Sequence, residues 1–278
     1  MKMYQVDAFA QQLFQGNPAA VLILEEWLDD DVMQNIAQEN NLAETAFVKK
    51  QDERNFEIRW FTPVAEVDFC GHATLASAFV LFRRNASLKQ LSFHVRKLGE
   101  FIIHQADDGK IHMNFPIRRA VQVGEYPAEL RAGLSKPFKA VYLSPQAYIV
   151  EYASVQDVLD EQPDLAQLKK LGKLRTAITS SNRDVAITAQ GFDSYAQFDC
   201  VSRYFAPAMG IDEDPVTGSI HTGIVPIWAD RLGKTKLVAY QASKRGGTLY
   251  CKILDDERME ISGYAKLYMT AEIFPENE

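Results

Sequence analysis

Residues 68–82 read DFCGHATLASAFVLF and residues 214–228 read DPVTGSIHTGIVPIW, and in each segment a turn of small residues leads into an apolar run. A similar pentapeptide precedes each segment, RWFTP at 59–63 and RYFAP at 203–207. The offset between the copies is 144 residues at the pentapeptides and 147 at the glycines that open the apolar runs, which a three-residue insertion explains. Because the order of the predicted strands and helices also repeats, we interpret the chain as a duplicated fold.

Hydrophobic periodicity predicts the same kinds of element in both halves. Strands are predicted in the first half at 2–9, 19–24, 44–48 and 56–61, with a meander at 91–96, 100–105 and 110–115, and helices are predicted near 30–40 and at 71–82. In the second half we expect strands at 139–143, 147–152, 174–180, 184–189, 196–205, 237–243, 248–253, 258–263 and 266–270, and helices at 154–171 and after Gly218. The irregular stretch 116–123 follows the meander, so the predicted lobes are 1–118 and 119–278, and the last strand is allowed to pack on the N-terminal lobe.

Composition and charge argue against several classes of protein. The net charge of −7 is distributed along the chain without a basic stripe, which argues against a nucleic-acid partner. The longest apolar stretch, 73–82, is far shorter than the roughly 20 residues that cross a bilayer. The start of the chain carries no signal-peptide pattern, so we expect a cytoplasmic protein. The cysteines and histidines show no metal-site spacing, and no dinucleotide-binding or P-loop motif is present, so neither a metal nor a cofactor is expected.

Glycine at the start of each apolar helix points to an anion site. The first N–H groups of a helix have no partner within the helix, and glycine lets a ligand approach them. If the two halves face each other about a pseudo-twofold axis, the helices that begin at Gly71 and Gly218 would direct two positive ends at one cleft. A small carboxylate would suit that cleft, whereas glycines that merely allow tight packing are the alternative.

Glu44 is the strongest candidate for acid–base chemistry among the ionisable residues near these turns. It is the only charge in the run AETAFV, at the mouth of a predicted strand, and such apolar surroundings raise the pKa of a carboxyl group. His72 directly follows Gly71, and Asp214 precedes the second turn, so both are expected to face the cleft. The further candidates are Glu66, Asp68, Glu213 and His221.

Five segments resemble the phenazine-biosynthesis-like (PhzF) isomerase family. They are NPAAV at 17–21, NNLAETAFV at 40–48, FCGHATLA at 69–76, EDPVTGS at 213–219 and QASKRGG at 241–247. The resemblance implies an α/β (α+β) fold of the diaminopimelate epimerase type, with two pseudo-symmetric lobes that each wrap a mixed, largely antiparallel sheet around a central helix. It also implies a homodimer without cofactor or metal.

The same resemblance implies roles for residues of this chain. Glu44 corresponds to the family's proton shuttle, and His72, Asp214 and Ser219 correspond to residues that surround the substrate. Backbone amides of the turns at Gly71 and Gly218 would hold the substrate carboxylate. The expected function is therefore that of an isomerase that moves a proton on a small carboxylated substrate, such as a cyclic or amino acid.

Cys70 distinguishes this chain from the epimerase relatives, which place a thiol before each glycine turn. Here the second position is Thr217, whose hydroxyl cannot take a proton from carbon near neutral pH, so a two-thiol racemase is disfavoured. Two alternatives remain open. One is an amino-acid epimerase in which Cys70 works with a carboxylate, and the other is a catalytically idle protein that binds a small acid or a partner protein.

Overall fold

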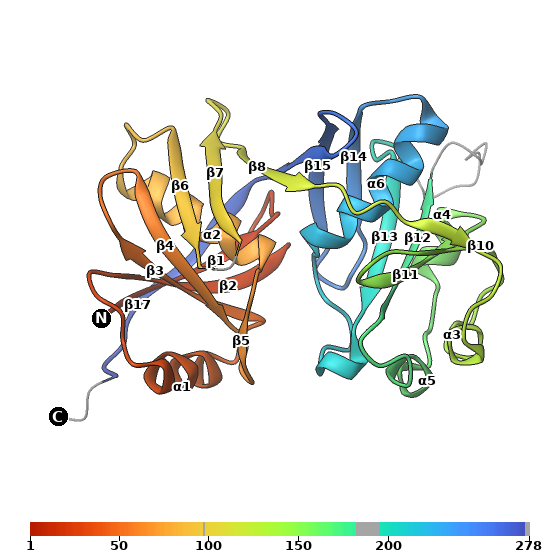
Figure 1. Ribbon diagram of the computed structural model, residues 1–278, viewed down its shortest axis with the longest axis horizontal. Coiled ribbons are helices and arrows are strands. Elements are labelled where there is room, and N and C mark those ends of the chain that lie inside the picture. Colours follow the sequence, from red (N-terminus) through yellow and green to blue (C-terminus); the bar gives the residue numbers. More distant parts are fainter. Residues whose placement is uncertain (97, 182–194, 276–278) are drawn as a thin grey trace. The chain divides into compact units, whose positions relative to one another are not determined.

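The computed structural model describes residues 1–96, 98–181 and 195–275, and the chain forms two compact units (Figure 1). Unit 1 comprises Met1–Asn114 together with Ser262–Glu278, and unit 2 comprises Phe115–Ile261. The chain thus leaves unit 1 slightly before the predicted boundary at residue 118, and it returns to unit 1 near its end. The return is explained by pairing, because β17 (Ala265–Glu272) runs antiparallel to β1 (Lys2–Ala8) and covers an edge that would otherwise be open.

Unit 1 contains a mixed sheet whose strands follow the predicted order. Between β1 and β17, its elements are β2 (Asn17–Leu24), α1 (Asp30–Asn40), β3 (Glu44–Lys50), β4 (Asn55–Phe61), β5 (Glu66–Val67), α2 (Gly71–Arg84), β6 (Gln90–Val95), β7 (Gly99–Gln105) and β8 (Ile111–Pro116). Strand β2 runs antiparallel to β1 and parallel to β3, whereas β3 and β4 are antiparallel and β4 and β6 are parallel. Strands β6, β7 and β8 form the predicted meander.

Helix α2 is the central helix of unit 1. All of its residues from Gly71 to Phe82 are buried except the half-buried Phe79, and it packs against β1, β2, β3 and β17 (Figure 1). A helix that is apolar on every side must be enclosed, which explains why the strands wrap around it. Helix α1 is amphipathic instead and buries only Met33, Ile36 and Ala37.

Unit 2 repeats this arrangement. Its elements are β9 (Val121–Val123), α3 (Ala128–Ala132), β10 (Phe138–Leu143), β11 (Ala147–Tyr152), α4 (Val155–Leu159), α5 (Leu165–Lys169), β12 (Arg175–Ser181), β13 (Cys200–Phe205), the 3-10 turn η2 (Pro207–Met209), α6 (Gly218–Leu232), β14 (Lys236–Gln241), β15 (Gly247–Ile253) and β16 (Arg258–Gly263). From β10 to β15, successive neighbours pair antiparallel, parallel, antiparallel, parallel and antiparallel, as β1, β2, β3, β4, β6 and β7 do in unit 1. The buried helix α6 packs against β11, β12, β14 and β15, so the predicted fold class is confirmed.

The predicted helix at 154–171 is wrong as a single element. Pro163 lies between two short helices, α4 and α5, because proline disfavours helical geometry in the residue before it and cannot donate a backbone hydrogen bond. Ser154 caps α4 and Asp164 caps α5 through their side chains. The predicted strand at 184–189 lies outside the described residues. Within the described ranges, the helices are all too short or too polar to cross a membrane.

The duplication extends to individual ion pairs. Arg59 donates from Nε and Nη2 to the two carboxylate oxygens of Glu66 at 2.7 and 2.8 Å, and Arg203 does the same to Glu213 at 2.7 and 3.0 Å. Each guanidinium also lies 5.1 Å from the ring centroid of the phenylalanine two residues later. Glu66 and Glu213 therefore stabilise the segments that lead to α2 and α6, so the role of both glutamates is structural.

The ion pairs also locate the insertion. The offset between the copies is 144 at Phe61 and Phe205 but 147 at Glu66 and Glu213. The three additional residues of unit 2 thus lie between the phenylalanine and the glutamate, in the segment that contains the turn η2.

Candidate functional site

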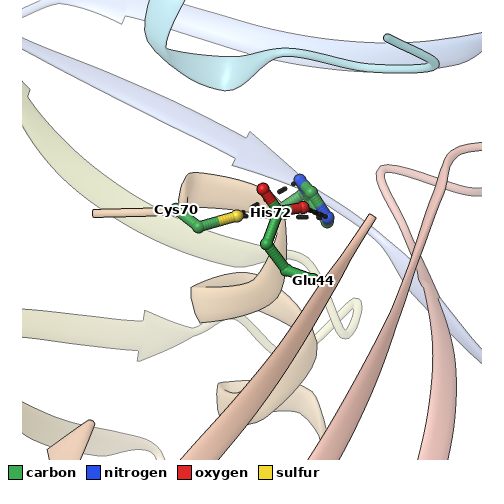
Figure 2. Close-up of side chains that lie close together, drawn as sticks. All are labelled: Glu44, Cys70 and His72. Carbon is green, nitrogen blue, oxygen red and sulfur yellow. Dashed lines mark hydrogen bonds and ion pairs between the residues drawn. The ribbon is translucent and has the colours of Figure 1, made fainter. Parts of the chain in front are cut away.

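Glu44, Cys70 and His72 lie together at one end of the sheet of unit 1 (Figure 2). Glu44 is the first residue of β3, and His72 is the second residue of α2, whose N-cap is Cys70. The His72 Nε2 atom lies 3.0 Å from Glu44 Oε2, and Cys70 Sγ lies 3.4 Å from His72 Nδ1. The imidazole thus contacts the carboxylate through one ring nitrogen and the thiol through the other.

Burial and neighbouring groups shift the pKa values of His72 and Cys70. Desolvation alone would lower the pKa of His72, but the neighbouring Cys70 and Glu44 raise that pKa well above its ordinary value of 6.5. Burial and the charge of Glu44 raise the pKa of Cys70 to about 11. Near neutral pH the site therefore holds an imidazolium and a neutral thiol.

Glu44 is the more accessible member of the ion pair. Its side chain is 14% exposed, and that of His72 is 6% exposed. The contact with His72 is an ion pair and not a well-directed hydrogen bond, since Glu44 Oε2 meets no donor at hydrogen-bonding geometry within the described residues. Oε2 itself is buried, so the exposed part of the Glu44 side chain lies outside that atom, and a general base would have to use the other carboxylate oxygen.

The same three side chains could hold a metal ion. Their donor atoms lie within 4.8 Å of one another, and thiolate, imidazole and carboxylate are the three kinds of zinc ligand in proteins. They form the one such group found within the described residues. The expectation that the protein works without a metal stays a prediction.

The helices that begin at the two glycine turns, α2 and α6, have no side-chain cap. Their N-cap residues, Cys70 and Thr217, are extended. Uncapped first-turn N–H groups attract anions. The anion site expected at Gly71 and Gly218 stays a prediction.

Asp214 and Ser219 belong to a polar network in unit 2. Asp214 accepts a short hydrogen bond from the Thr217 hydroxyl, and the buried Gln241 donates from Nε2 to the Asp214 carbonyl at 2.7 Å. Gln146 Nε2 donates to Ser219 Oγ at 3.2 Å. Asp214 is half-buried and His72 is buried, so neither is a solvated surface residue.

His221 is a buried structural residue at a position equivalent to Thr74. Its Nδ1 lies 2.8 Å from the Thr217 carbonyl, just as Thr74 Oγ1 donates to the Cys70 carbonyl at 2.6 Å. Burial lowers the pKa of His221 to about 4, so it is neutral near pH 7. These contacts remove it from the candidates for acid–base chemistry.

Strand register identifies a residue that sequence reasoning missed. Thr45 pairs with Phe61 and Thr176 pairs with Phe205, so the residues before the threonines, Glu44 and Arg175, occupy equivalent positions. The signal for Arg175 lay in the repeat itself, but the offset between the copies changes along the chain. Only the pairing of strands shows which residues correspond.

Comparisons with known proteins agree on one family across the chain. Residues 6–271 match the PhzC-PhzF family model, described as phenazine biosynthesis-like protein. An uncharacterized isomerase of Pseudomonas aeruginosa is 43% identical over 271 residues, which cover 97% of each chain. The crystal structure of a PhzF family phenazine biosynthesis protein from Enterococcus faecalis superposes with a TM-score of 0.88 at 38% identity, covering 98% of each chain. A probable proline racemase from Agrobacterium radiobacter shares the fold at 8% identity, with a TM-score of 0.61 and coverage of 98% of this chain and 92% of its own.

Proposed function

The chain belongs to the phenazine biosynthesis-like family, whose relatives include proteins named isomerases, and on that premise we propose that Glu44 moves a proton on a small carboxylated substrate. The observation that carries the proposal is the ion pair between Glu44 and His72 at the start of α2. It combines a carboxylate that can take a proton with a cation that can stabilise negative charge. The proposed reaction needs neither a cofactor nor a metal.

The proposed reaction has two proton transfers. Glu44 removes a proton from a carbon next to, or conjugated with, an electron-withdrawing group, and the C–H electron pair moves into the neighbouring double-bond system. Glu44 then returns the proton to another position, which shifts a double bond or changes a stereocentre. A positioned acid–base group contributes roughly 10²–10⁴-fold to such a rate.

His72 supports both steps in this proposal. Before the transfer its positive charge is paired with the Glu44 carboxylate, and after the transfer the neutral Glu44 leaves that charge to stabilise the substrate anion. The proposal also assigns substrate binding to the helix-opening turns at Gly71 and Gly218 and to Asp214 and Ser219. The cytoplasmic homodimer implied by the sequence is part of the same proposal, and analytical ultracentrifugation tests its oligomeric state.

The test is a screen of small cyclic and amino acids for isomerisation in deuterated water, followed by mass spectrometry. With Glu44 as the only base, part of the product keeps the original hydrogen, because the abstracted proton can return before it exchanges with solvent. Glu44→Gln keeps the shape of the side chain and should bind the substrate without turning it over. Glu39→Gln, at an exposed position on α1, is the matched control and should behave as the wild type.

The contact between Cys70 and His72 favours one alternative, an epimerase in which the thiol is a base. The raised pKa of Cys70 and the threonine at position 217 argue against it. Loss of turnover in Cys70→Ser together with normal turnover in Glu44→Gln would establish the thiol mechanism. Small carboxylates that bind without any deuterium uptake would instead indicate a binding protein.

A further inference from the structure

Arg175 stands in unit 2 where Glu44 stands in unit 1. Glu44 pairs with Ala19 in the parallel contact of β2 and β3, and Arg175 pairs with Ala147 in the parallel contact of β11 and β12. The antiparallel register to β4 and β13 gives the same correspondence. The antiparallel register, anchored at the repeated residues Phe61 and Phe205, therefore places an arginine at the duplicate of the proposed proton-shuttle position.

Arg175 adjoins the polar network at the start of α6. Its backbone N–H donates to the Gln146 carbonyl at 3.2 Å, and the Gln146 side chain donates to Ser219 Oγ at 3.2 Å and to the Tyr204 hydroxyl at 3.4 Å. Burial raises the pKa of Tyr204 to about 12, and the charge of Arg175 opposes that rise, so the guanidinium lies within electrostatic range of the Tyr204 hydroxyl. Ser219 corresponds to His72 at an offset of 147, so this neighbourhood mirrors the contact of Glu44 with His72.

The charge of Arg175 is not neutralised by the described residues. Arg59, Arg203 and Arg231 each form an ion pair with a carboxylate. The half-buried Arg175 side chain makes neither an ion pair nor a hydrogen bond within the described ranges. A partly desolvated guanidinium without an anion is unfavourable, and it becomes favourable when a carboxylate binds its planar fork.

We propose that Arg175 binds a carboxylate of the substrate, so that the protein selects acids with two negatively charged groups over monocarboxylic acids. One group would bind at the first-turn amides of α6 and the second at Arg175, both of which belong to unit 2. This inference rests on the proposed function for its link to catalysis, but the binding step can be measured without turnover. Arg175 is thereby a specificity-determining residue.

The test compares the binding of succinate and butyrate to the full chain by isothermal titration calorimetry. The wild type should bind succinate more tightly than butyrate. Arg175→Met should weaken succinate binding by about 10–100-fold, the usual range for a charged hydrogen bond, and leave butyrate binding unchanged. Arg175→Lys, which keeps the charge but not the fork, should fall between the two.

Lys173→Met is the matched control, because it removes an exposed positive charge two residues away and should bind succinate as the wild type does. Circular dichroism checks that each variant folds, and Arg175→Lys carries the comparison if Arg175→Met does not. Equal succinate affinity in the wild type and in the Arg175 variants, or no preference of the wild type for succinate, overturns the proposal. If Glu44→Gln binds succinate normally but the wild type exchanges no substrate proton, the proposed function fails while this inference stands.

Discussion

His221 should make the protein lose stability as the pH falls from 7 toward 4. The carbonyl of Thr217 only accepts hydrogen bonds, so Nδ1 of His221 carries the hydrogen, and Nε2, 3.2 Å from Ser202 Oγ, is left to accept one. Protonation at Nε2 would require the Ser202 hydroxyl to turn from donor to acceptor and would place a charge in a site with no exposed surface. Burial accordingly lowers the pKa of His221 to about 4, below the 6.5 of an exposed histidine.

The sign and size of the effect follow from linkage. Between pH 6.5 and 4 the unfolded chain binds the proton and the folded protein does not, so acid favours unfolding over this range. At about 1.4 kcal/mol per pH unit, the free energy of unfolding should fall by about 2 kcal/mol by pH 5 and by about 3 kcal/mol by pH 4. All of this contribution is present above pH 6.5.

Urea unfolding at pH 7 and pH 5, in the wild type and in His221→Asn, measures the effect. Asparagine can still donate to the Thr217 carbonyl but does not titrate, so the variant starts less stable at pH 7 and loses about 2 kcal/mol less on acidification. Other groups that titrate act on both proteins alike, and the difference between the two removes them. An equal loss of stability in both proteins would refute the assignment of a buried, neutral His221.

Two further predictions concern side chains that the site and the repeat single out. Arg203→Leu should lower the free energy of unfolding by about 2–3 kcal/mol, because it leaves the partly buried Glu213 unpaired. Arg59→Leu should lower it by less, because the carboxylates that pair with Arg59 are more exposed. Urea unfolding measures both losses, and equal losses would contradict the burial argument. Cys70 should react with iodoacetamide at pH 8 about 10²-fold more slowly than a free cysteine, since its pKa is raised to about 11. Glu44→Gln should speed the reaction, because it removes the negative charge that raises the pKa of the thiol. Peptide mass spectrometry measures the labelling of Cys70, and rapid labelling of the wild type would contradict the raised pKa.

The fold was largely predictable because both halves carry strong local signals. Alternating apolar residues mark most strands, and the apolar runs after Gly71 and Gly218 mark the two central helices. The failures came where local pattern is overridden or insufficient. Pro163 interrupts a helical pattern in 154–171. The prediction allowed the last strand to pack on the N-terminal lobe, but its pairing with β1 depends on contact between chain ends that no local pattern encodes.

The site was predictable residue by residue but not as an arrangement. Glu44 and His72 were each proposed from their surroundings, yet their contact at 3.0 Å depends on how β3 and α2 pack. Glu66 and Glu213 were candidates because of their position in the chain, and the structure shows them paired with arginines. Arg175 was missed because its meaning depends on strand register, which sequence spacing does not give.

The duplicated halves preserve their framework and differ where chemistry is expected. Both units keep the arginine–glutamate pair and the side-chain hydrogen bond to the N-cap carbonyl of the central helix. At equivalent positions of the repeat, however, unit 1 has Glu44 where unit 2 has Arg175, and His72 where unit 2 has Ser219. Two equivalent bases would suit removal and return of a proton on opposite faces of a carbon. Here unit 1 has the Glu44 carboxylate beside the His72 imidazolium, whereas unit 2 has the Arg175 guanidinium and the hydroxyl group of Ser219 at the equivalent positions. This asymmetry favours the proposed single base over a symmetric pair of bases.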